Sequence, residues 1–261
     1  MEFDYYYTFL LLQLIKPFLP KESHYIYRNV CKIWRRVFNK GNRKKVCEYA
    51  AINGYVNVLE FCRNQKFPCP WDERVCYKAA KHNNLNILQW ARSQKLHPKL
   101  RCPWDERTCK YAARSGNLEM LRWIRTPRFL NSSKFDYVYD DLCPWDETTC
   151  SKAAKHNNLN ILQWARDQDP PCPWDEWTCI YAARGGHIEI LIWARAQKDC
   201  VCPWNKKVCT YAAKKGRLNT LQWLRSQIPP CPWNIRKCIK AAEKNNQHHI
   251  LHWIQNNNHP D

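Results

Sequence analysis

The sequence predicts an all-α fold, a helical solenoid of about seven stacked units that follows a short N-terminal helical segment. Two observations lead to this prediction. The tripeptide Cys-Pro-Trp occurs six times, and an Ala-Ala pair follows each of seven cysteines at the same distance. The steps between successive tripeptides are 33, 41, 29, 30 and 29 residues. A period of this length is typical of solenoids, in which a short unit buries its apolar face only against its neighbours.

A first helix is expected to begin directly after each Cys-Pro-Trp. The next residue is Asp or Asn in all six copies, and these side chains cap helix N-termini. The helix should extend through a second cysteine and the Ala-Ala pair, and end at a Gly or Asn. These two residues tolerate the left-handed backbone conformation that closes a helix. The expected closing residues are Gly54, Asn83, Gly116, Asn157, Gly186, Gly216 and Asn245.

A second helix is expected to follow each closing residue. Its apolar positions are spaced i, i+3 and i+5, as in Leu118, Leu121 and Trp123, and it ends near an arginine such as Arg125. A cation at that place suits the negative end of the helix dipole. The last copy has one extra residue, which we place after Asn245. Repetition of the tryptophans at core positions favours packing over base stacking.

Composition and charge limit the class of protein. The chain has 261 residues, a formal net charge of +19 and 16 cysteines. Residues 1–8 contain no basic segment, and the apolar run at 9–15 is too short to cross a bilayer. We therefore expect an intracellular monomer of the cytoplasm or nucleus that makes no membrane contact and keeps its thiols reduced. The positive charge favours acidic partners.

The repeated tracts resemble the ankyrin repeat. AARSGNLEMLRWIR at 112–125 and AARGGHIEILIWAR at 182–195 follow its Ala-Ala-x-x-Gly-x-Leu-Glu-x-Leu pattern. The resemblance implies ankyrin repeats over residues 41–256, the first around 42–64 and the last around 231–256. The chain departs from the pattern at 107–110, where Arg-Thr-Cys-Lys replaces the usual Thr-Pro-Leu-His. The Cys-Pro-Trp-Asp-Glu variant is similar to a subtype of giant DNA viruses and some protists, which implies a viral protein acting on host proteins.

Residues 1–40 resemble another family. The tract LPKESHYIYRNVCKIWRRVF at 19–38 is similar to the second half of an F-box, although the usual opening Leu-Pro-x-Glu is absent before Phe9. This resemblance implies that the segment docks a Skp-type adaptor of a cullin-RING ubiquitin ligase. The residues expected to make that contact are Leu11, Leu12, Ile15, Leu19, Pro20, Val30, Cys31 and Trp34. The alternative is a helix pair that only covers the exposed apolar face of the first repeat.

A row of cations is the main candidate binding site. In ankyrin repeats the two positions before the closing Gly commonly face the partner on the concave side. Carried over to this sequence, that resemblance implies a partner-binding groove lined by Lys81, His82, Arg114, Lys155, His156, Arg184, Lys214, Lys215 and Lys244. An acidic protein would fit this groove, and a nucleic acid is the less favoured occupant. A solvated surface without a partner is the alternative.

Catalytic and metal sites are not expected. Thirteen of the 16 cysteines occupy repeat positions, and the sequence has no Cys-x-x-Cys pair of the kind that commonly binds zinc. We expect no cofactor. The long spacer at 126–142 is either a binding element or an unconstrained loop. The sequence therefore predicts a non-enzymatic protein–protein interaction scaffold, a substrate-recruiting adaptor with an F-box and ankyrin repeats. The alternatives are a protein that sequesters a host factor and a basic solenoid that binds nucleic acid.

Overall fold

The computed structural model describes residues 44–64, 68–93, 100–126, 142–198 and 200–257. Within these ranges the chain forms fourteen helices and no strand, which confirms the all-α prediction. Two predicted elements lie outside the described residues, namely the loop core at 127–141 and the F-box-like segment. The latter includes Leu11, Leu12, Ile15, Leu19, Pro20, Val30, Cys31 and Trp34.

The helices follow one another as consecutive pairs. The first helices are α3 (Lys44–Asn53), α5 (Glu73–Lys81), α7 (Glu106–Ser115), α9 (Glu147–Lys155), α11 (Glu176–Gly185), α13 (Lys206–Lys214) and α15 (Ile235–Glu243). The second helices are α4 (Val56–Arg63), α6 (Leu85–Ala91), α8 (Leu118–Arg125), α10 (Leu159–Arg166), α12 (Ile188–Arg195), α14 (Leu218–Ser226) and α16 (His248–Asn256).

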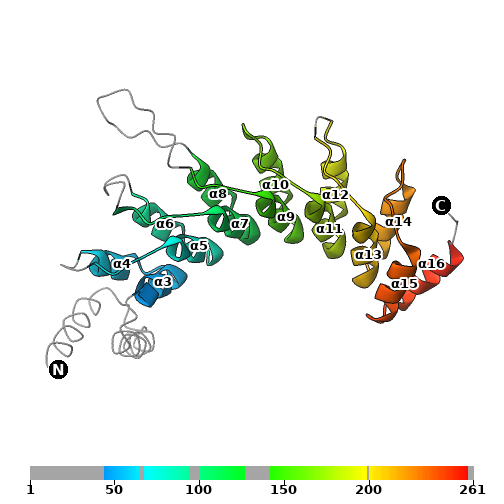
Figure 1. The fold of residues 1–261 in the computed structure, drawn as a ribbon, viewed down its shortest axis with the longest axis horizontal. Coiled ribbons are helices and arrows are strands. Elements are labelled where there is room, and N and C mark those ends of the chain that lie inside the picture. The colour runs from blue at the N-terminus through cyan, green and yellow to red at the C-terminus, as the bar shows by residue number, and fades with distance from the viewer. Residues whose placement is uncertain (1–43, 65–67, 94–99, 127–141, 199, 258–261) are drawn as a thin grey trace.

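The pairs stand side by side in an elongated, gently curved row (Figure 1). Neighbouring first helices pack closely along the whole row, whereas neighbouring second helices touch each other much less. The closer spacing places the first helices on the inner side of the curve. No helix among the described residues has the length and apolar character needed to cross a membrane.

The ends of the first helices follow the predicted signals. Oδ1 of Asp105 accepts a hydrogen bond from the backbone N–H of Arg107, two residues on, at 3.1 Å, and the Asp or Asn before α5, α9, α11 and α13 caps its helix in the same way. Asn234 caps α15 by accepting from the N–H of Lys237, three residues on. Gly116 closes α7 at φ 79°. The closing residue predicted for the last pair was wrong. Asn246, not Asn245, has the positive φ of 55°, so the extra residue lies before the turn.

The interior is made of small first-helix residues and large second-helix residues. Cys109, Ala112 and Ala113 of α7 are completely buried, and so are Met120, Leu121 and Ile124 of α8. The predicted apolar spacing was therefore only partly correct. Leu118 and Trp123 are half-buried at the margin of the core. The second helices turn positions i+2, i+3 and i+6 toward the first helices, and the tryptophans cover the edge.

A layer of Trp and Arg side chains joins each pair to the next. Trp174 of a Cys-Pro-Trp lies edge-to-face on Trp193 of its own pair, with ring centroids 5.8 Å apart. The guanidinium of Arg166, from the preceding second helix, stacks 4.3 Å from the Trp174 ring and donates to the Cys172 carbonyl at 2.6 Å. The same arrangement recurs with Arg63, Arg125, Arg195 and Arg225. The helix dipole alone is thus an incomplete explanation of these arginines.

Candidate partner-binding surface

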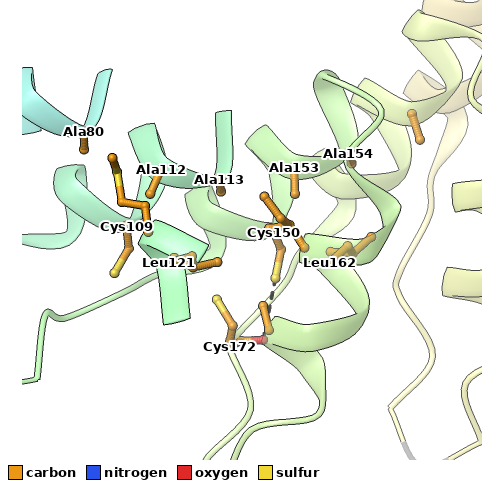
Figure 2. Close-up of a cluster of buried hydrophobic side chains, with 14 of the residues drawn as sticks. Ala80, Cys109, Ala112, Ala113, Leu121, Cys150, Ala153, Ala154, Leu162 and Cys172 are labelled. Atoms are coloured by element: carbon orange, nitrogen blue, oxygen red, sulfur yellow. Dashed lines mark hydrogen bonds between the residues drawn. The ribbon is translucent and has the colours of Figure 1, made fainter. Parts of the chain in front are cut away.

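The cysteines serve packing in this structure. Of the fifteen cysteines in the described ranges, all are free thiols and all except Cys200 are buried. The Sγ of Cys150 donates toward the carbonyl of Cys172 in the next pair at 3.8 Å (Figure 2). Burial raises the pKa of the Cys109 thiol well above its ordinary value, so this group stays protonated and is a poor nucleophile. No three His, Cys, Asp or Glu side chains within the described ranges converge to hold a metal ion.

The predicted cations lie on equivalent turns of neighbouring first helices. Lys81, Arg114, Lys155, Arg184 and Lys214 occupy the last turns of α5, α7, α9, α11 and α13, and we call these five residues the cationic stripe. All are exposed except Arg184, which is half-buried. The row of first helices therefore places one cation at the same height on each of five consecutive helices.

The other predicted groove residues lie at the ends of these helices. His82, His156, Lys215 and Lys244 are the C-caps of α5, α9, α13 and α15, and all four are exposed. The last first helix departs from the stripe, because Glu243 takes the position that a cation has in the five preceding helices. The cations of the stripe thus end at α13.

The structure adds aromatic rings that the sequence alone does not assign to this surface. The Nζ atoms of Lys152 and Lys155 lie 5.1 and 5.6 Å from the ring centre of Tyr181 on the next first helix. Lys81 lies 5.9 Å from the ring of Tyr111 in the same way. A signal was present, since Tyr and Lys share the position two residues after the first-helix cysteine. The cation–π attraction to each of these rings favours a defined position for the lysine side chains of the preceding helix pair.

Positive charge accumulates where α7 and α9 meet. Burial, and then the charges of Lys155, Lys110 and Arg114, lower the pKa of Lys152. Burial, and then the charges of Arg114, Lys155, Lys152 and His187, lower the pKa of His156. Within the described ranges no carboxylate is in ion-pairing distance of these side chains. The cluster is therefore uncompensated, and an incoming anion would relieve its mutual repulsion.

The start of the row differs, because carboxylates neutralise some cations of α3 and α5. Glu48 of α3 forms ion pairs with Lys78 and with Arg74 of α5, the latter at 3.4 Å. Lys44 pairs with Asp72, the N-cap of α5, at 2.5 Å. Carboxylates thus offset part of the positive charge of α3 and α5.

The chain matches no model of a known protein family and no curated protein sequence. Its function is therefore inferred from its own residues and their geometry.

Proposed function

We propose that this chain is a non-enzymatic protein-binding scaffold of ankyrin type, with about seven repeats, which holds an acidic partner against the cationic stripe. The observation that supports the proposal most is the uncompensated charge around Arg114, Lys152 and Lys155. Exposed cations that repeat once per unit offer several weak contacts along one partner segment. Such contacts add up, and they also speed association with an acidic protein.

A direct test compares two variants that remove the same charge from different surfaces. Arg114→Gln/Lys155→Gln neutralises two cations of the stripe. Arg122→Gln/Lys198→Gln neutralises two exposed cations on α8 and after α12. We expect the stripe variant alone to bind a synthetic oligoglutamate peptide about tenfold more weakly than the wild-type chain at low salt. Equal loss in both variants would show that only the net charge matters and would contradict a defined site.

The partner of residues 1–40 follows from the resemblance to an F-box. We propose that this segment holds a Skp-type adaptor of a cullin-RING ubiquitin ligase, so that the stripe presents a substrate protein to the ligase. Holding both proteins on one chain raises their effective concentration for each other. Trp34→Ala should reduce co-purification of the adaptor from cells while leaving the oligoglutamate affinity unchanged. Undiminished capture of the adaptor would instead favour a plain scaffold that sequesters its acidic partner.

A further inference from the structure

From α5 onward, the N-terminal ends of the first helices change from acidic to basic along the row. Glutamate is the first residue of α5, α7, α9 and α11, but α13 begins with two lysines and α15 with Ile235, Arg236 and Lys237. The basic end is defined as Lys206, Lys207, Arg236 and Lys237, all exposed. The acidic edge is defined as Glu147, Asp175 and Glu176.

The cations of the basic end oppose the local stability of their helices. The N-terminus of a helix is the positive end of its dipole, so a first-turn glutamate is favourable there and a first-turn lysine is not. The side chains of the basic end are exposed and make no contribution to the core. Residues that break a local stability rule without a packing role are typical of functional positions.

The compensation found at the other end of the row is missing here. Lys44 at the start of α3 has the carboxylate of Asp72 beside it, whereas Asn234 takes the place of that residue after Lys206. Arg74 has Glu48, whereas the neutral Ile180 takes that place before Lys207. In the described ranges, no carboxylate reaches ion-pairing distance of the basic end.

The acidic edge adjoins the basic end. The Nζ of Lys207 lies 5.5 Å from the ring centre of Trp177, the residue after Glu176. Burial raises the pKa of Asp175, and the nearby charges of Glu176 and Glu147 raise it further. Two carboxylate-bearing helices, α9 and α11, are thus followed directly by two helices that begin with cations.

We propose that these two surfaces together bind one segment of a partner protein in which an acidic block adjoins a basic block. The acidic block would lie on α13 and α15, and the basic block on α9 and α11. A nucleic acid carries one sign of charge along its length, so the acidic edge would repel the part that extends beyond the basic end. The inference rests on the proposed function in one respect, that the chain binds a protein. The basic end and the acidic edge share no residue with the cationic stripe.

The test measures the affinity of the full chain for three fluorescent probes. The first is a peptide with a block of glutamates and a block of lysines joined by a short Gly-Ser linker. The second is an oligoglutamate peptide with the same number of glutamates, and the third is single-stranded DNA of the same negative charge. We expect the two-block peptide to bind most tightly, because only that probe is complementary to both surfaces.

The decisive variant is Lys206→Glu/Lys207→Thr, which rewrites the start of α13 as the Glu147-Thr148 start of α9. We expect about tenfold weaker binding of the two-block peptide. The melting temperature should be unchanged or higher, because a first-turn glutamate is restored. The control Arg122→Glu/Lys198→Thr removes the same charge from other exposed positions and should bind the peptide as the wild-type chain does.

Three outcomes would overturn the proposal. One is wild-type affinity of Lys206→Glu/Lys207→Thr for the two-block peptide. The others are read in the chain that carries Arg114→Gln/Lys155→Gln, so that the stripe contributes little: binding of oligoglutamate as tight as that of the two-block peptide, and tighter binding of the single-stranded DNA. Failure of the proposed function is a separate result, because it is measured with Arg114→Gln/Lys155→Gln, whose substitutions lie outside both surfaces.

Discussion

Along the chain, the Trp and Arg layer between helix pairs keeps the same contacts. The exposed N-terminal ends of the first helices, in contrast, change their charge. In the layer the same contact recurs, since Arg166 donates to the Cys172 carbonyl at 2.6 Å and Arg195 to the Cys202 carbonyl at 2.7 Å. At the exposed ends, Glu147 of α9 is replaced by Lys206 in α13. Contacts between units thus permit little variation, whereas exposed positions are free to become specific for a partner.

A substitution inside one unit should have the largest effect on stability. Leu162 of α10 is completely buried. We expect Leu162→Ala to lower the free energy of unfolding by about 2–5 kcal/mol, because it removes apolar contacts and leaves a cavity. Urea unfolding followed by circular dichroism would measure the change. The control is Gln163→Ala at the exposed neighbouring position. Equal losses of unfolding free energy in the two variants would contradict a larger contribution of the buried side chain.

A change in the layer between units should come next. Arg166→Lys keeps the charge but loses the planar group that both stacks on Trp174 and donates to the Cys172 carbonyl. We expect a loss of roughly 1–3 kcal/mol in the free energy of unfolding. Arg122→Lys at an exposed position of α8 is the matched control. A loss no greater than that of the control would mean that the layer does not join the units.

A smaller effect is expected where a side chain joins the turns of two pairs. The Nδ2 of Asn158 donates to the carbonyl of Ala113 in the preceding first helix at 2.7 Å. Asn158→Ala should lower the free energy of unfolding by about 1 kcal/mol, the typical contribution of one such bond. Urea unfolding should show almost no change for Asn219→Ala, an exposed position of α14. Equal midpoints for the two variants would contradict a structural role of this bond.

The smallest effect concerns pH. Burial lowers the pKa of His187, and burial together with neighbouring cations lowers that of His156, both from an ordinary value of 6.5. As the pH falls below about 6.5, the unfolded chain therefore binds more protons than the folded chain, and the free energy of unfolding decreases. We expect His156→Gln/His187→Gln to make the melting temperature less dependent on pH between neutral and mildly acidic conditions. An unchanged pH dependence would contradict this contribution.

Features that depend on a few adjacent residues could be predicted from the sequence. The two ends of a helix favour particular residue types, a capping side chain such as Asp105 at the start and a residue such as Gly116 that tolerates the left-handed conformation at the close. The residue types therefore predict both features. Local rules fail where an insertion has two equivalent positions, as with Asn245 and Asn246. The repeat pattern showed that an insertion is present but could not say on which side of the turn it lies.

Contacts between units could not be predicted, because they depend on the geometry of the stack. The bond from Asn158 to Ala113 joins residues 45 positions apart. Lys155 meets the Tyr181 ring only because successive first helices lie side by side. The sequence located the cations of the candidate site. It could not show that the rings of the next helix accompany them.

The most direct test of a binding surface on the first helices is hydrogen–deuterium exchange of the full chain with and without the two-block peptide. We predict slower exchange on binding in the first helices, chiefly α9, α11, α13 and α15, and little change in α10, α12, α14 and α16. Slower exchange confined to the second helices, or spread evenly over both sets, would contradict a partner-binding surface on the first helices.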